Sequence, residues 1–205
     1  MTAHELPSKL LEQAVNEMSR LPGIGRKTAL RLILHLLRED KKDALKLGES
    51  LTTLVSEIKY CKICHNITEN ETCDICTDTS RDHETICVVE DIRDLLAIEN
   101  TQQYRGVYHV LGGIISPIDG VGPGDLTIDM LRQRIEQNTV NEIIFALPTT
   151  MEGDTTNYYL HKQIAGRVHK ITTLARGLAF GDELQYADEV TLGRSLIERI
   201  DYQSG

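Results

Sequence analysis

Two Cys-x-x-Cys pairs lie within sixteen residues of this 205-residue chain, Cys61 with Cys64 and Cys73 with Cys76. A stretch this short buries too little apolar surface to hold a fold of its own. Four thiolates around one Zn²⁺ can do so, because binding free energy on the order of 10–16 kcal/mol then acts as folding free energy. Four sulfurs also fill a tetrahedral shell and leave no position for water or substrate. The spacing therefore predicts a structural zinc site.

Other roles for these cysteines fit less well. Disulfides are expected in exported chains, and residues 1–7 lack the basic and apolar stretches of an export signal. No apolar run is long enough to cross a bilayer, so we expect a cytoplasmic protein. His65 is an alternative ligand, but four well-spaced cysteines predict that it is a surface residue. Cys87 lies in an apolar run and is predicted to be buried in a strand rather than reactive.

The net charge of −9 is unevenly distributed along the chain. The first sixty residues carry ten Lys or Arg against eight Asp or Glu, and the remaining residues carry twelve against twenty-three. Residues 18–38 contain five Lys or Arg and no acid. A local positive patch is what phosphate binding requires, and the total charge does not report it. The alternative is a solvated helix face.

The positive patch coincides with a glycine-containing hairpin between two amphipathic helical patterns. Pro22 ends the first helix, and two glycines permit positive φ and leave the backbone bare. The second helix then begins with two cations, at an end whose free amides attract phosphate. A further arginine just before the hairpin can reach the same strand. The candidate DNA contacts are Arg20, Gly23, Gly25, Arg26 and Lys27.

Residues 21–29 resemble the helix–hairpin–helix DNA-binding motif, which reads h-P-G-h-G-x-x-x-A, where h is apolar. Such hairpins contact the sugar–phosphate backbone. We therefore expect sequence-independent binding to single- and double-stranded DNA that weakens with salt. The alternative is a helix junction that only packs. A third amphipathic helix is predicted over residues 43–58 and leads to the cysteines.

After the cysteines, apolar strands alternate with helical patterns, which predicts a parallel α/β sheet. In such sheets functional residues gather at the carboxyl ends of the strands. The stretch 112–125 is rich in Gly and Pro and matches neither a dinucleotide fingerprint nor a Walker A loop. It is predicted to be an ordered surface loop, with a partner or DNA contact as the alternative. The expected strands are 85–89, 107–111, 142–147 and 168–174, and the expected helices are 91–100, 126–137 and 154–166.

Acidic residues stand at two of these strand ends: Glu90 after the first strand, and Glu152 and Asp154 after the third. This order resembles the Toprim domain of primases, topoisomerases and related nucleases. There the third strand is followed by Asp-x-Asp-x-Glu-Gly, whose aspartates help to hold Mg²⁺. Those two positions are Pro148 and Thr150 here, so the shell for strand cleavage is incomplete. The three acids are expected to bind a divalent ion weakly or to contact a partner, and the alternative is that Glu90 and Glu152 cap helix N-termini.

The order of these parts, together with Tyr-Ala-Asp-Glu-Val-Thr-Leu-Gly-Arg at 186–194, is similar to the bacterial RecR family of recombination mediators. The resemblance runs from about residue 10 to residue 199. One departure is Leu-Pro-Thr-Thr-Met-Glu-Gly at 147–153, where family members usually have Thr-Asn-Pro-Thr-Val-Glu-Gly.

The resemblance implies a nucleoid-associated protein without catalytic activity. Such proteins act with RecO, and in many bacteria with RecF, to load a recombinase onto single-stranded gaps. They form dimers and a ring-like tetramer, with the N-terminal helices and the C-terminal tail at subunit contacts. RecO docking on the Toprim-like domain would give Glu90, Glu152 and Asp154 a role in protein contact.

We therefore predict a multi-part α/β protein. Two other function classes stay open: a Mg²⁺-dependent nuclease or topoisomerase-like enzyme that uses the three acids, and a protein adaptor whose hairpin only packs. The predicted parts are a helix–hairpin–helix domain at 1–58, a four-cysteine zinc finger at 59–80, a Toprim-like domain at 81–176 and a tail at 177–205 that serves oligomerisation and contains a helix at 187–200.

Overall fold

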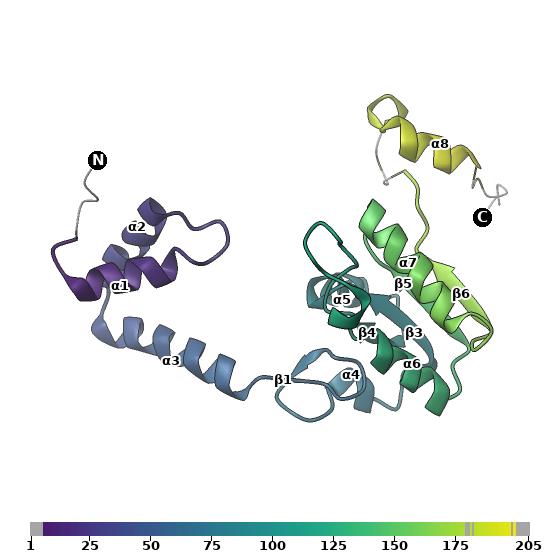
Figure 1. The fold of residues 1–205 in the computed structure, drawn as a ribbon, viewed down its shortest axis with the longest axis horizontal. Coiled ribbons are helices and arrows are strands. Elements are labelled where there is room, and N and C mark those ends of the chain that lie inside the picture. The colour runs from purple at the N-terminus through teal and green to yellow at the C-terminus, as the bar shows by residue number, and fades with distance from the viewer. Residues whose placement is uncertain (1–5, 179–180, 182, 198, 200–205) are drawn as a thin grey trace. The chain divides into compact units, whose positions relative to one another are not determined.

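The computed structural model describes residues 6–178, 181, 183–197 and 199. They belong to two compact units, Met1–Ile58 and Lys59–Gly205 (Figure 1). No helix in this described part of the chain is both long enough and apolar enough to cross a membrane.

The first unit is made of three helices: α1 (Lys9–Met18), α2 (Arg26–Leu36) and α3 (Lys41–Glu57). Its buried core is small, since α1 buries only Val15 and α2 only Ala29. Side chains cap two of the helices, with Ser8 accepting from the Leu11 amide and Asp40 from the Lys42 amide. The helix α3 buries none of its residues within the unit, although its apolar positions repeat at helical spacing.

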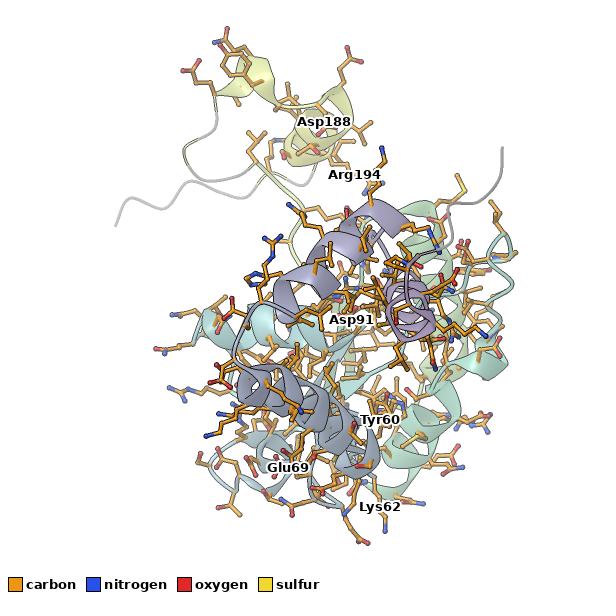
Figure 2. All side chains as sticks on the ribbon, turned by 90° about the vertical axis from the view of Figure 1, so that its left-hand side faces the viewer. Tyr60, Lys62, Glu69, Asp91, Asp188 and Arg194 are labelled. Carbon is orange, nitrogen blue, oxygen red and sulfur yellow. The ribbon has the colours of Figure 1, made fainter. Side chains whose placement is uncertain are left out.

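The second unit begins with the cysteine-containing module. Strand β1 (Lys59–Tyr60) pairs antiparallel with β2 (Ile67–Thr68), and the short helix α4 (Asp74–Thr77) follows. Figure 2 labels Tyr60, Lys62 and Glu69 on this module. The hairpin brings the first Cys-x-x-Cys pair to the start of α4, where the second pair lies.

A four-stranded parallel sheet forms the body of the second unit, in the order β4-β3-β5-β6. Alternating side chains of the strands point to opposite faces. Ile86 and Val88 of β3 pack with α6 and α7 on one face, and Cys87 and Val89 pack with α5 on the other. The elements are β3 (Asp82–Val89), α5 (Ile92–Asn100), β4 (Gly106–Val110), α6 (Ile128–Gln137), β5 (Glu142–Ala146), α7 (Met151–Ile164) and β6 (Lys170–Thr173).

Two segments outside the sheet complete the described unit. The loop after β4 contains an antiparallel bridge between Ser116 and Val121 and a 3₁₀ turn, η1 (Pro123–Asp125). After β6 the chain forms a second 3₁₀ turn, η2 (Leu184–Tyr186), and the helix α8 (Glu189–Ile197).

The predicted fold class is confirmed: a helical N-terminal unit, a small cysteine module and a parallel α/β sheet. Several predicted boundaries are wrong by a few residues. The helix expected from Asp154 begins at Met151, because Thr150 caps it, and β3 begins at Asp82 rather than Thr85. The β1–β2 pair and α4 were not predicted. The end of the last predicted helix, Ile200, lies outside the described residues.

Candidate functional site

The four cysteines converge on one point in the second unit. All four are buried, and their Sγ atoms lie within 4.8 Å of one another. The Sγ atoms of Cys64 and Cys73 are 3.5 Å apart. A tetrahedral zinc ion with Zn–S bonds of about 2.3 Å places its sulfurs roughly 3.8 Å apart, so the cluster has the right size. It does not include His65, whose ring instead stacks on Tyr60 at 4.5 Å.

The local backbone explains how sixteen residues build this cluster. The Cys61 amide donates to the Asn66 carbonyl, and the His65 amide donates to the Cys61 carbonyl, which closes a tight turn around the first pair. His65 takes a positive φ of 61° in this turn. The Cys73 amide donates to the Cys61 sulfur at 3.4 Å, a contact that joins the two cysteine pairs.

The electrostatics of the four sulfurs call for a cation. Hydrogen bonds from neighbouring thiols lower the pKa of Cys73, while the pKa of Cys64 is raised by the bonds with Cys73 and Cys76 and by burial. One thiolate is therefore favoured without metal, but further thiolates would repel it. A divalent ion removes that repulsion. The donor set and its closed shell fit a structural Zn²⁺ held by Cys61, Cys64, Cys73 and Cys76.

The zinc module is attached directly to the sheet. The Val110 amide on the edge strand β4 donates to the Cys64 carbonyl at 2.8 Å. Ile75, between the second pair of cysteines, packs against the cysteine cluster and against both cores of the sheet. Zinc binding and folding of the sheet are therefore physically linked.

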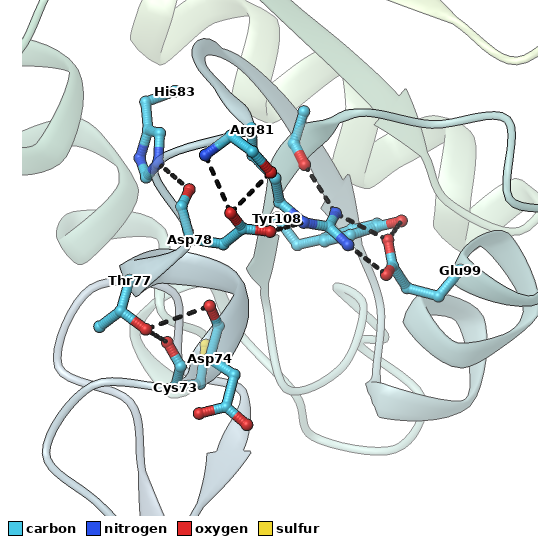
Figure 3. A network of polar contacts seen from close by, with 10 residues as sticks. Cys73, Asp74, Thr77, Asp78, Arg81, His83, Glu99 and Tyr108 are labelled. Carbon is cyan, nitrogen blue, oxygen red and sulfur yellow. Dashed lines mark hydrogen bonds and ion pairs between the residues drawn. The ribbon is translucent and has the colours of Figure 1, made fainter.

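A polar network makes a second attachment (Figure 3). Arg81 donates to both carboxylate oxygens of Glu99 on α5, at 2.9 and 2.5 Å, and to the Gly106 carbonyl at 3.0 Å. Its Nε also lies 3.7 Å from Asp78, just after α4. The Tyr108 hydroxyl donates to Glu99 at 2.7 Å. The side chain of Arg81 is only 15% exposed, so these bonds act in a partly desolvated place.

In the first unit, the hairpin between α1 and α2 leaves its backbone open. Gly23 has a φ of +77°, which favours glycine, and Gly25 is the N-cap of α2. A Cβ added at either glycine would meet no atom within 4 Å, so neither glycine is needed for close packing. No side chain caps α2, and its first turn contains no acid, in contrast to α1 and α3. The exposed amides at this end suit an anionic phosphate.

The cations around the hairpin differ in their partners. Arg26 donates to Asn16 Oδ1 at 2.5 Å and lies 3.5 Å from Glu12, so it joins α2 to α1. Arg20 pairs with Glu17 at 2.8 Å. The side chains of Lys27 and Arg31 make no hydrogen bond or ion pair with the rest of the described chain. They line a groove on α2 with Arg38.

The acids at the carboxyl edge of the sheet have separate surroundings. Among the described residues, only the four cysteines form a group of three or more potential metal ligands, so Glu90, Glu152 and Asp154 do not form one. Burial, followed by repulsion from Asp94 and Asp91, raises the pKa of Glu90. Asp154 instead pairs with Arg176, whose Nη2 lies 2.6 Å from Oδ1.

Helix caps at this edge come from other residues than those considered in the sequence. Asp91 caps α5 in a capping box with Asp94, and Thr150 caps α7 by accepting from the Gly153 amide. The alternative that Glu90 and Glu152 serve as N-caps is therefore wrong. A Cβ on Gly153 would lie 1.9 Å from the Pro148 carbonyl oxygen, so this glycine lets the chain turn tightly after β5.

Comparison with known proteins accounts for most of the chain. Residues 11–55 match the RecR helix-hairpin-helix model, residues 58–78 the RecR four-cysteine zinc finger domain, residues 84–175 the Toprim domain and residues 177–200 the RecR C-terminal model. The Recombination protein RecR of Bacteroides fragilis is 58% identical over 198 residues, which is 97% of each chain. Those of Flavobacterium johnsoniae and Porphyromonas gingivalis are 57% and 54% identical, and these matches cover at least 95% of each chain.

The chain belongs to the RecR family. The resemblance inferred from the motifs is thus confirmed, and so is the structural zinc site that the RecR zinc-finger match and the cysteine cluster both support. Cys87 is buried in β3 of the RecR fold, and burial raises its pKa to about 12, as expected of a structural cysteine.

Reasoning from the sequence missed the polar contacts that link the parts of this RecR chain. Arg81 and Glu99 are eighteen residues apart, and Asp154 and Arg176 are twenty-two apart. No spacing rule joins residues at such separations. A signal was available only for the caps, since Asp91 with Asp94 and Thr150 before a helical pattern are typical N-terminal residues.

Proposed function

We propose that this protein is a non-enzymatic, DNA-binding recombination mediator in DNA repair. It acts with RecO-like and RecF-like partners to load a recombinase onto single-stranded gaps. The relatives of this chain carry the name Recombination protein RecR, which supports a role in recombination. The observation that carries DNA binding is the open, uncapped start of α2 beside unpaired cations.

We expect Gly23, Gly25 and Lys27 to make the main contacts between the hairpin and phosphate. The two glycines let a phosphate approach the amides of α2, and Lys27 adds a full charge without giving up a partner. Arg20 and Arg26 belong to the same proposed surface, but each would have to exchange an internal partner for phosphate. We therefore expect Lys27 to contribute more to affinity than Arg26.

The test is a titration of gapped DNA across salt concentrations with Lys27→Ala. Loss of one phosphate contact is expected to weaken binding and to reduce the slope of log K against log salt by about 0.7–0.9. The matched control is Lys46→Ala on α3, whose Nζ has no partner among the described residues. If the affinity and slope of Lys27→Ala equal those of the control, the hairpin is not the DNA contact.

A second variant separates backbone access from charge. Gly25 has an ordinary φ of −76° and open space around it, so Gly25→Ala is expected to change stability little. A methyl group at this position would obstruct a phosphate that approaches the α2 amides. Weaker DNA binding with unchanged thermal unfolding supports the proposal. Unchanged binding would favour the adaptor alternative, in which the hairpin only packs.

The Toprim match keeps a Mg²⁺-dependent nuclease as the second candidate. We propose no catalysis, because the two aspartate positions are Pro148 and Thr150 and the remaining acids do not form a ligand group. Incubation with nicked and gapped DNA and Mg²⁺ is expected to give no cleavage. Product formation that Glu152→Gln abolishes would overturn the non-enzymatic assignment.

Assembly, location and domain division complete the proposal. We propose a homodimer or homotetramer, a cytoplasmic location on the nucleoid, and functional parts at 1–58, 59–80, 81–176 and 177–205. The last of these parts is proposed to serve oligomerisation. Glu90, Glu152 and Asp154 are proposed to face a RecO-like partner rather than a catalytic metal. Measurement of mass in solution with and without gapped DNA tests assembly and DNA engagement together, and a monomer under both conditions would contradict the ring.

A further inference from the structure

The carboxylate of Asp154, at the carboxyl edge of the sheet, forms an ion pair with Arg176. Arg176, which follows β6, places Nη2 2.6 Å from Oδ1 and Nη1 3.5 Å from Oδ2 of this carboxylate. The side chain of Arg176 is only 22% exposed. The hydrogen bond and charge of Arg176, and then the charge of Arg194, lower the pKa of Asp154. The pair therefore joins the chain after β6 to the first turn of α7 by a charge-assisted hydrogen bond.

Arg194 connects this pair to the C-terminal helix. It lies on α8 and lines a cleft of about 470 Å³ together with Thr149 at the sheet edge, Arg176 and Gly177 after β6, and Asp188 and Thr191 at the start of α8. Figure 2 labels Asp188 and Arg194 on this segment. The Asp188 carboxylate accepts from the Thr191 amide and so caps α8 rather than pairing with Arg194.

The helix α8 has no fully buried residue in the described chain. None of its nine residues is buried, whereas α7 buries four. A nine-residue helix is too short to be stable in water by propensity, because isolated helices below about 12–15 residues are marginal. Polar contacts across the cleft that α8 lines with residues 175–177 are therefore expected to contribute to keeping α8 folded.

We propose that the Asp154–Arg176 ion pair holds the start of the C-terminal segment at the carboxyl edge of the sheet. Because Arg176 lines one cleft with Asp188, Thr191 and Arg194, this ion pair acts as a salt-sensitive latch for α8. This inference is independent of DNA binding, which involves the first unit.

The test is amide hydrogen exchange of α8 in the full-length, zinc-loaded protein. Asp154→Asn is expected to speed exchange at residues 189–197 about fivefold, in line with a partly exposed ion pair. Added NaCl is expected to speed exchange in the wild type and to have less effect in the variant. Glu152→Gln is the matched control, since it removes an acid from the same turn of α7, and it is expected to leave α8 unchanged.

Two further measurements test whether the Asp154–Arg176 pair holds α8. Arg176 makes other contacts, so its own loss does not isolate the pair. The charge swap D154R with R176D is therefore compared with each single change and is expected to restore slow exchange at α8. Millimolar Mg²⁺ is expected to act no more strongly than NaCl of the same ionic strength. The latch is refuted if Asp154→Asn leaves α8 exchange unchanged, if the swap restores nothing, or if Mg²⁺ releases α8 well beyond the salt control.

Discussion

The cysteine cluster and the carboxyl edge of the sheet are both built from residue types that bind metals, yet they differ in outcome. Four sulfurs come within 4.8 Å of one another, while Glu90, Glu152 and Asp154 form no such group. One site supplies a closed shell for zinc. At the other site, burial raises the pKa of Glu90, and Asp154 is paired with Arg176.

The difference follows from how each set of ligands is held. The cysteines lie on two tight turns whose local hydrogen bonds fix their spacing, so their convergence is a property of sixteen consecutive residues. The carboxylates follow separate strands, and their fate depends on every neighbour that tertiary structure brings to the edge. Ligands that are close in the sequence can therefore converge through local structure, whereas ligands on separate strands converge only where the tertiary structure brings them together.

Loss of a zinc ligand should have the largest effect. Cys61→Ser or Cys76→Ser is expected to release zinc and to destabilise the second unit by about 5 kcal/mol, or roughly 10–20 °C in Tm, because metal binding is folding free energy here. Because the Val110 amide donates to the Cys64 carbonyl, loss of zinc is expected to destabilise the sheet as well. Metal analysis and thermal unfolding are the measurements.

The matched control is His65→Asn. Asparagine tolerates the positive φ of this turn and leaves the four sulfurs in place. It should retain one zinc per chain. Full zinc content in both cysteine variants would refute the assigned ligands. The cysteine cluster could then no longer be contrasted with the sheet edge as a zinc site.

Glu99→Gln should have an intermediate effect. The carboxylate accepts from Arg81 and Tyr108, and its loss leaves a partly buried guanidinium poorly compensated, so we expect about 2 kcal/mol of destabilisation. The hydrogen bond from Arg81 lowers the pKa of Glu99, so this contribution is present above the unfolded pKa and is lost as pH falls through the lowered folded pKa.

Denaturant unfolding at several pH values measures this contribution. Glu69→Gln serves as the control, since this acid in the zinc module has no partner among the described side chains, and its effect should stay within about 0.5 kcal/mol. Equal effects in the two variants would show that the network of Figure 3 does not attach the module to α5.

Glu90→Gln should have the smallest effect and the opposite sign. Burial and the neighbouring Asp94 raise the pKa of Glu90, so its charged form opposes folding, and wild-type stability should fall as pH rises through the raised pKa. The neutral variant is expected to be as stable as the wild type at pH 7 or slightly more stable. Marked destabilisation that depends on Mg²⁺ would instead make Glu90 a metal ligand.

Local features of this chain could be predicted from the sequence, and remote contacts could not. The zinc ligands, the hairpin and the alternation of strands and helices depend on spacings of a few residues, which periodicity and turn chemistry encode. The pairing of Asp154 with Arg176 joins residues that are twenty-two positions apart and depends on where β6 ends. For α3, helical periodicity predicted the helix correctly, but the pattern did not reveal that the unit buries none of its residues.

Native mass spectrometry after dialysis against Zn²⁺ and Mg²⁺ tests the contrast most directly, because it counts the ions on each chain. The account predicts one zinc per chain, lost in Cys61→Ser, and no magnesium. A retained magnesium ion that disappears in Glu152→Gln, or a zinc count that the cysteine variant does not change, would contradict it.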